Sequence, residues 1–227
     1  MFEREREPGG GERVGILGGT FDPVHYGHLA IAEEVYCALQ LTRMVFVPAG
    51  LPPHKPAAGI TPVQQRVTML ECAIATNPHF TLSLVDVQRA GPSYTVETLR
   101  LLRQEWGPRA ELFFVIGSDS LKDLPSWYDP EGILAQATIV ALTRPGYVDV
   151  RAGLLERLPA LKDRLILLEG PLLAISATDL RQRVAEGRPI KYQTPEVVEE
   201  YILRHGLYRQ AGRRAERQED THAAHAI

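Results

Sequence analysis

The stretch that decides the fold is "GILGGTFDPVHYGHL", residues 15–29. A short apolar run ends at Gly18 and Gly19, and His25 and His28 follow just before a segment with helical spacing opens. After a strand, glycines let the backbone approach a ligand closely, and the N–H groups that begin the next helix offer partial positive charge. The stretch therefore predicts a strand, an anion-binding turn and a helix.

The rest of the chain alternates short apolar runs with longer amphipathic segments. Strands are predicted at residues 13–17, 44–48, 80–85, 111–117, 138–143 and 164–170, and helices at 27–40, 61–76, 94–106 and 176–186. This alternation predicts one α/β domain over residues 13–208, a doubly wound parallel sheet with a small C-terminal helical part. Residues 1–12 and 209–227 are rich in charged and small residues, which is typical of disordered tails.

Composition excludes several classes of protein. The formal net charge of −3 over 227 residues gives no basic excess, so neither a nucleic acid nor a membrane surface is expected as partner. Cys37 and Cys72 lie far apart without a C-x-x-C pair, which excludes a disulfide framework and a cysteine zinc site; we expect both to lie reduced in the core. No apolar segment resembles a secretory signal or a membrane span, which favours a cytoplasmic protein.

The opening turn differs from the common phosphate-binding loops. No lysine follows its glycines, and the G-x-G-x-x-G pattern is absent. The histidines must therefore supply the donor to phosphate that the lysine provides in such loops. His25 and His28 are three residues apart, and both can point toward one cavity if His28 lies in the first helical turn. An imidazole beside phosphate can carry a proton and donate to an anionic oxygen. Two chance surface histidines, or half of a metal site without a third ligand at suitable spacing, are the alternatives.

Six segments occur in an order that resembles one enzyme family. They are "GGTFDPVHYGHL" (18–29), "PPHK" (52–55), "SYTVETL" (93–99), "GSDSLKDLPSW" (117–127), "ISATDLRQRV" (175–184) and "YILRHGLY" (201–208). Together they resemble the nicotinate-nucleotide adenylyltransferases, members of the nucleotidyltransferase superfamily with the T/HxGH element. The resemblance implies a Rossmann-like nucleotidyltransferase domain. It also implies transfer of AMP from ATP to nicotinate mononucleotide, giving pyrophosphate and deamido-NAD for NAD biosynthesis, with Mg²⁺ carried on ATP.

On the ATP side, the resemblance implies that His25 and His28 are the catalytic donors to the phosphates. It assigns the cradle to Gly18, Gly19, Thr20 and Phe21, and a second anion-binding helix start to Ser176, Thr178 and Arg181. In the second segment, Ser176 followed by Asp179 is typical of a capping box, so a plain capped helix with a surface arginine is the alternative. The family more often has serine at Ala177, which leaves open a side-chain contact there.

The acceptor side falls on other segments. Thr95 begins a predicted helix, so N–H groups near Thr95 and Tyr128 are expected to receive a ring carboxylate while Trp127 stacks on the pyridine ring. Asp119 is expected to bind ribose hydroxyls or water on Mg²⁺, and the resemblance places His54 and Lys55 near the substrates. The alternatives are helix caps, a half-buried tryptophan and solvated loop charges. Gln193 and Thr194 replace the usual Leu-Val of the family, which leaves open the packing before the last helix.

Two other functions remain to be weighed against AMP transfer to nicotinate mononucleotide. A sister enzyme acting on phosphopantetheine would leave "SYTVETL" and "GSDSLKDLPSW" unexplained. A nucleotide sensor without turnover would be expected to lack a catalytic imidazole or to carry an added partner domain. We expect no metal ligands supplied by the protein itself, and a homo-oligomer is compatible with the sequence.

Overall fold

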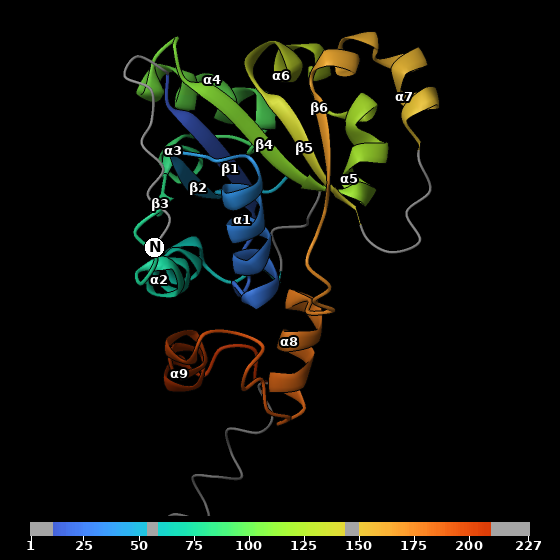
Figure 1. The fold of residues 1–227 in the computed structure, drawn as a ribbon. Coiled ribbons are helices and arrows are strands. Elements are labelled where there is room, and N and C mark those ends of the chain that lie inside the picture. Colours follow the sequence, from blue (N-terminus) through green and yellow to red (C-terminus); the bar gives the residue numbers. More distant parts are fainter. Residues whose placement is uncertain (1–10, 54–58, 144–149, 210–227) are drawn as a thin grey trace, which may run out of the picture.

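The computed structural model describes residues 11–53, 59–143 and 150–209, and its centre is a parallel sheet (Figure 1). Its six strands run in the order β3-β2-β1-β4-β5-β6, with every neighbouring pair parallel. They are β1 (Arg13–Gly19), β2 (Arg43–Pro48), β3 (Phe80–Leu82), β4 (Glu111–Gly117), β5 (Thr138–Thr143) and β6 (Leu165–Glu169). The order reverses between β1 and β4, so the prediction of a doubly wound sheet is confirmed, and the ligand crevice is expected at this switch point.

The helices connect these strands. They are α1 (Tyr26–Ala38), α2 (Val63–Ile74), α3 (Val85–Gln88), α4 (Thr95–Trp106), α5 (Ser118–Asp123), α6 (Pro130–Gln136), α7 (Arg151–Arg157), α8 (Ala177–Ala185) and α9 (Glu196–His205), with 3-10 turns η1 (Leu124–Ser126) and η2 (Pro159–Asp163). The four predicted helices are present, with ends shifted by at most two residues. Helices α3, α5, α6 and α7 have four to seven residues, too few for a repeating apolar pattern. The predicted strand 80–85 stops at Leu82 because α3 begins at Val85.

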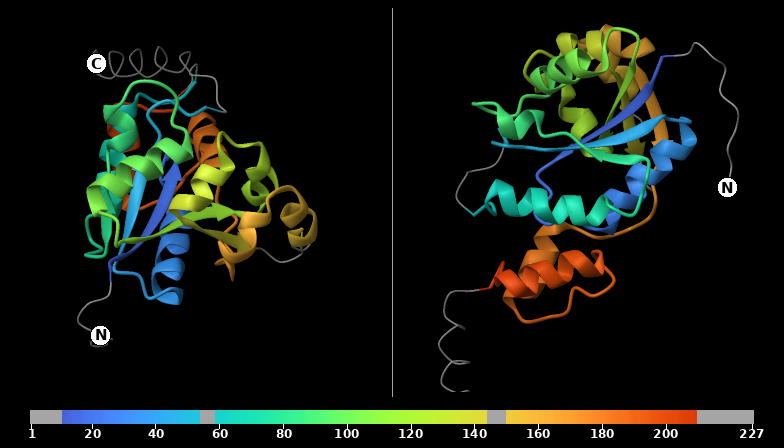
Figure 2. Two further views of the ribbon diagram at one scale, coloured as in Figure 1. Left: turned by 90° about the horizontal axis from the view of Figure 1, so that it is seen from above. Right: turned by 90° about the vertical axis from the view of Figure 1, so that its left-hand side faces the viewer.

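Two hydrophobic cores lie on opposite faces of the sheet. Along β4, Phe114 and Ile116 belong to the core under α4 and α6, whereas Phe113 and Val115 belong to the core under α1 and α2. Figure 2 shows the helices as layers on both sides of the strands. Burial on both faces explains why the strands are continuous apolar runs.

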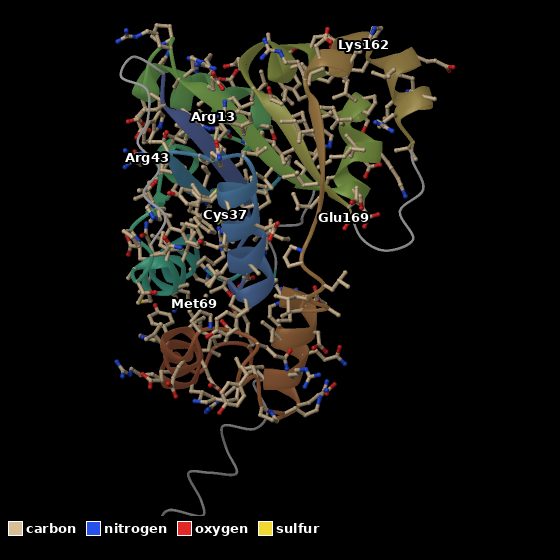
Figure 3. The ribbon with its side chains drawn as sticks, viewed as in Figure 1. Arg13, Cys37, Arg43, Met69, Lys162 and Glu169 are labelled. Atoms are coloured by element: carbon tan, nitrogen blue, oxygen red, sulfur yellow. The ribbon has the colours of Figure 1, made fainter. Side chains whose placement is uncertain are left out.

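Helices α8 and α9 form the C-terminal helical part, beyond α2 and away from the sheet (Figure 2). The chain leaves the sheet at Glu169, the last residue of β6 (Figure 3), and α9 then packs against α2 through Val198 and Ile202. The segment before α9 contacts the opening turn: Thr194 is buried, and its hydroxyl donates to the Val24 carbonyl oxygen at 2.8 Å. The replacement of the family's Leu-Val is thus accommodated by a hydrogen bond.

The expected core position of the two cysteines is wrong. Cys37 and Cys72 are free thiols on the exposed faces of α1 and α2 (Cys37 is labelled in Figure 3). In α1 the buried positions include Ala32 and Val35, and Cys37, two residues after Val35, falls on the opposite side of the helix. No helix in the described ranges is long and apolar enough to cross a membrane.

Candidate active site

A cavity of about 530 Å³ opens where the carboxyl ends of β1 and β4 diverge. Its volume is within the usual range for a small-molecule site. The ends of β1, β2 and β4 form one side, and the start of α4 with the segment after α5 forms the other. The lining residues are 17–20, 28, 31, 47, 49, 52–53, 86, 93–95, 98, 114–117, 120, 127–128 and 133.

The two histidines lie together at the start of α1. His25 is the N-cap residue and His28 lies in the first turn, with their rings stacked at 3.7 Å between centroids. His28 lines the cavity, whereas His25 is only 6% exposed and lies behind it. A Cβ atom on Gly27 would come within 3.0 Å of the His25 ring, which explains the glycine between them. The alternative of two chance surface histidines is therefore wrong.

Hydrogen bonding and burial define the protonation of these rings. The Nδ1 atom of His28 accepts the backbone N–H of His25 at 3.3 Å, so a neutral His28 ring carries its proton on Nε2. Burial lowers the pKa of His25 to about 4. At pH 7 the ligand-free site therefore holds His25 as a neutral ring.

The glycine turn is shaped from below by Phe21. Gly18, Gly19 and Thr20 line the cavity, but Phe21 is buried in the core, with its ring 5.0 Å from that of His28. A Cβ atom on Gly19 would lie 3.0–3.2 Å from the Phe21 ring, so the glycine lets this ring pack beneath the turn. Phe21 itself has a left-handed backbone with φ of 49°, which burial of its ring stabilises.

On the opposite side, the structure brings together three residues predicted for the acceptor. Thr95 is the first residue of α4, and Trp127 and Tyr128 follow η1; all three line the cavity. Trp127 packs edge-on against Phe114, with 6.3 Å between ring centroids. Aromatic faces and a helix N-terminus thus lie across the cavity from the glycine turn.

Three further predicted residues lie at the start of α8 and do not line this cavity. The Ser176 hydroxyl accepts the Asp179 N–H at 3.1 Å, which confirms the predicted N-cap. Arg181 donates from Nη1 to the Asp22 carbonyl oxygen at 2.7 Å and from Nη2 to the Thr178 hydroxyl at 3.3 Å. The Ile175 carbonyl oxygen lies 3.6 Å from a Cβ placed on Gly27, so the α8 N-terminus adjoins the histidine turn.

The remaining predicted residues are less well placed. The Asp119 side chain is 93% exposed in the first turn of α5, 4.0 Å from Lys122, and does not line the cavity. His54 and Lys55 lie outside the described residues, although Pro52 and Pro53 before them line the cavity. In the described part of the chain, no three His, Cys, Asp or Glu side chains are grouped to hold a metal ion.

Sequence reasoning missed a buried polar group on the acceptor side. Asp86 lines the cavity, and its carboxylate accepts the Thr98 hydroxyl and the Arg89 Nε–H, each at 2.9 Å. Thr98 lies one turn beyond Thr95, so these bonds anchor the start of α4. A local signal for this group is lacking, because the burial of Asp86 depends on contacts with a helix that begins nine residues later.

Comparisons with known proteins agree with this geometry. A family model described as cytidylyltransferase-like matches residues 16–183. Two relatives named probable nicotinate-nucleotide adenylyltransferase are 54% identical (Thermomicrobium roseum; 87% of this chain, 92% of the relative) and 53% identical (Roseiflexus sp. strain RS-1; 86% and 98%). A solved Plasmodium falciparum nicotinic acid mononucleotide adenylyltransferase, 20% identical, has the same fold with a TM-score of 0.68, covering 87% of this chain and 97% of its own. The chain therefore belongs to the cytidylyltransferase-like family and, within it, to the nicotinate-nucleotide adenylyltransferases, which are nucleotidyltransferase enzymes.

Proposed function

We propose that this enzyme transfers AMP from ATP to the 5′-phosphate of nicotinate mononucleotide, releasing pyrophosphate and forming deamido-NAD. Family membership supports this reaction, and structures of the Plasmodium falciparum enzyme are titled as complexes with APC and with NaAD. The observation that carries the proposal is one cavity with the His28 ring and glycine turn on one side and Thr95 with Trp127 on the other. Such a cavity can hold a phosphate chain and a pyridine ring together.

The reaction requires positioning more than covalent help. An oxygen of the mononucleotide phosphate attacks the α-phosphorus of ATP, a new P–O bond forms, and the bond to the bridging oxygen breaks with pyrophosphate leaving. Catalysis then consists of in-line alignment and stabilisation of charge on the phosphate oxygens. His28, whose Nδ1 accepts from the His25 backbone, donates its Nε2–H to these oxygens.

The other ATP contacts come from the backbone and from α8. N–H groups of the turn at Gly18, Gly19 and Thr20 cradle the phosphates together with the N-terminus of α1. Ser176 fixes the start of α8 beside this turn, and Arg181 extends a guanidinium toward it. In this arrangement Phe21 and His25 do not contact the substrates; their rings pack against the His28 ring and support the turn.

On the acceptor side, N–H groups near Thr95 and Tyr128 bind the ring carboxylate while Trp127 packs on the ring. The position of Thr95 at the N-terminus of α4 supports this role, because that end carries partial positive charge. Donors aimed at a carboxylate disfavour the uncharged amide, which cannot satisfy them equally.

Mg²⁺ is proposed to arrive on ATP, since this ion is usually held by substrate phosphates with one or two carboxylates. When bound it neutralises charge on the phosphates. Asp119 would be the protein group that reaches water on the ion or a ribose hydroxyl, because it stands exposed directly after the carboxyl end of β4. Homo-oligomerisation, a cytoplasmic location and the roles of His54 and Lys55 stay predictions.

The reaction is tested by incubating the purified protein with ATP, Mg²⁺ and nicotinate mononucleotide, and measuring pyrophosphate and dinucleotide. We expect equimolar pyrophosphate and deamido-NAD, with no product when phosphopantetheine replaces the mononucleotide. Binding of ATP without any product would instead indicate a nucleotide sensor. Formation of ADP, or of AMP without the dinucleotide, would contradict the proposal.

A further inference from the structure

Two oppositely charged side chains are buried behind the glycine turn, outside the cavity. Asp22 is 4% exposed and Arg66 is 1% exposed, and neither lines the cavity. Burying a charge costs several kcal/mol unless it is paired and fully hydrogen-bonded. Asp22 lies two residues after Thr20 in the chain, and Arg66 contacts the Thr20 carbonyl from α2, so both residues lie directly behind the glycine turn.

Arg66 joins three separate loops through their backbone oxygens. From α2, its Nη1 donates to the Thr20 carbonyl at 2.6 Å, its Nη2 to the Ala49 carbonyl at 2.8 Å, and its Nε to the Thr61 carbonyl at 3.0 Å. Thr20 and Ala49 both line the cavity, just after β1 and β2. A planar guanidinium can reach all three oxygens at once, whereas a lysine ammonium is a point charge on a flexible stem.

Asp22 completes the group. Its Oδ1 accepts the Tyr208 hydroxyl at 2.7 Å, and its Oδ2 accepts the Thr61 N–H at 3.1 Å. The Thr61 peptide thus links the two charged residues, since its N–H binds Asp22 and its carbonyl binds Arg66. Burial lowers the pKa of Arg66 and the charge of Asp22 opposes this change, while burial and Asp22 raise the pKa of Tyr208 far above its usual value. Tyr208 therefore remains a hydrogen-bond donor.

We infer that Arg66 and Asp22, with Tyr208, are positioning residues for adenylyl transfer, an inference that rests on the proposed function. Arg66 fixes the end of the glycine turn at Thr20, and Asp22 fixes the chain three residues before His25. Together they set the distance between the phosphate cradle and the histidine pair. Displacements of about 1 Å at a reacting centre can lower rates by about a hundredfold, so a fixed turn has direct kinetic value.

The test compares Arg66→Lys with Arg103→Lys. Arg103 on α4 also donates to three backbone carbonyls, those of Gly107, Ala110 and Gln136, but at the amino ends of β4 and β5. We expect both variants to lower the Tm. Only Arg66→Lys should lower kcat, by about ten- to a hundredfold, with both KM values within about threefold of the wild type.

A milder pair of variants keeps the test decisive if Arg66→Lys does not fold. Tyr208→Phe removes the hydroxyl that donates to Asp22. Its control is Tyr201→Phe on α9, where the Tyr201 ring packs on His205. We expect Tyr208→Phe to lower kcat by about three- to tenfold and Tyr201→Phe to leave kcat unchanged.

Wild-type kcat in folded Arg66→Lys or in Tyr208→Phe, or equal losses in the control variants, would overturn the inference. The wild type is assayed first. If it makes no dinucleotide, the proposed function fails, and this result is distinct from a failure of the inference about Arg66 and Asp22.

Discussion

Replacement of His25 by glutamine should change how stability depends on pH. Burial lowers the pKa of this ring from 6.5 to about 4. Between these values the unfolded chain binds a proton at His25 that the folded chain does not bind, so the free energy of unfolding rises with pH. The contribution is fully present above pH 6.5 and is lost as the pH falls toward 4.

The size of the effect follows from the two pKa values. Each pH unit between them corresponds to about 1.4 kcal/mol, which gives about 3 kcal/mol in all, of which about 2 kcal/mol should appear between pH 7 and pH 5. The assay is urea unfolding of the wild type and His25→Gln at several pH values in this range. Subtracting the two curves removes the contribution of carboxylates common to both proteins.

His79 provides the matched control, because its exposed ring stacks on Tyr36 at 4.5 Å. His79→Gln removes an imidazole outside the buried pair, so comparing it with His25→Gln isolates the effect of the buried ring. Parallel curves for the wild type and His25→Gln would show that His25 is not held neutral, and would refute the account of the histidine pair.

Three other substitutions test individual contacts by steady-state kinetics and thermal unfolding. His28→Ala should lower kcat by about 10²–10³-fold, as expected for loss of a donor to developing charge, whereas His79→Ala should not. Arg181→Ala should raise KM for ATP by about tenfold and KM for the mononucleotide much less; equal changes would contradict a role at ATP. Gly117→Ala should keep the wild-type Tm but raise KM for the substrates, because the added Cβ meets no atom within 4 Å and Gly117 lines the cavity. Gly15→Ala should lower the Tm and leave KM unchanged, because its added Cβ would lie 2.5 Å from a side chain.

Periodicity and local motifs predicted the part of the site that is contiguous in sequence. The glycine turn, the strand before it and α1 lie within one continuous stretch of residues. The Ser176 cap of α8 is likewise formed by neighbouring residues. Whether a predicted residue reaches the cavity depended on long-range packing. His25 and His28 have the predicted spacing, but only His28 lines the cavity, because His25 packs beneath it against Gly27.

Arg66 shows why the remainder could not be predicted. In α2, Arg66 lies on the same buried face as Leu70 and Ala73, and it is the largest of the fully buried side chains described. Arginine is mostly exposed as a residue type, and the carbonyl oxygens of Thr20 and Ala49 that satisfy its guanidinium come from loops distant in sequence. The cysteines show the opposite error, since the average burial of that residue type outweighed the helical pattern that places Cys37 outside. Arg66 and Cys37 thus both depart from the average burial of their residue types.

The central claim is that this cavity accepts a nicotinate nucleotide, and the ratio of kcat/KM for nicotinate mononucleotide to that for nicotinamide mononucleotide tests it most directly. Each donor left unpaired by the amide costs about 1–3 kcal/mol, so the acid should be preferred by about ten- to a hundredfold or more. Trp127→Ala should weaken both acceptors alike and preserve the ratio, since stacking does not distinguish acid from amide. Equal kcat/KM values for the two mononucleotides in the wild type would contradict a carboxylate site at Thr95 and Tyr128.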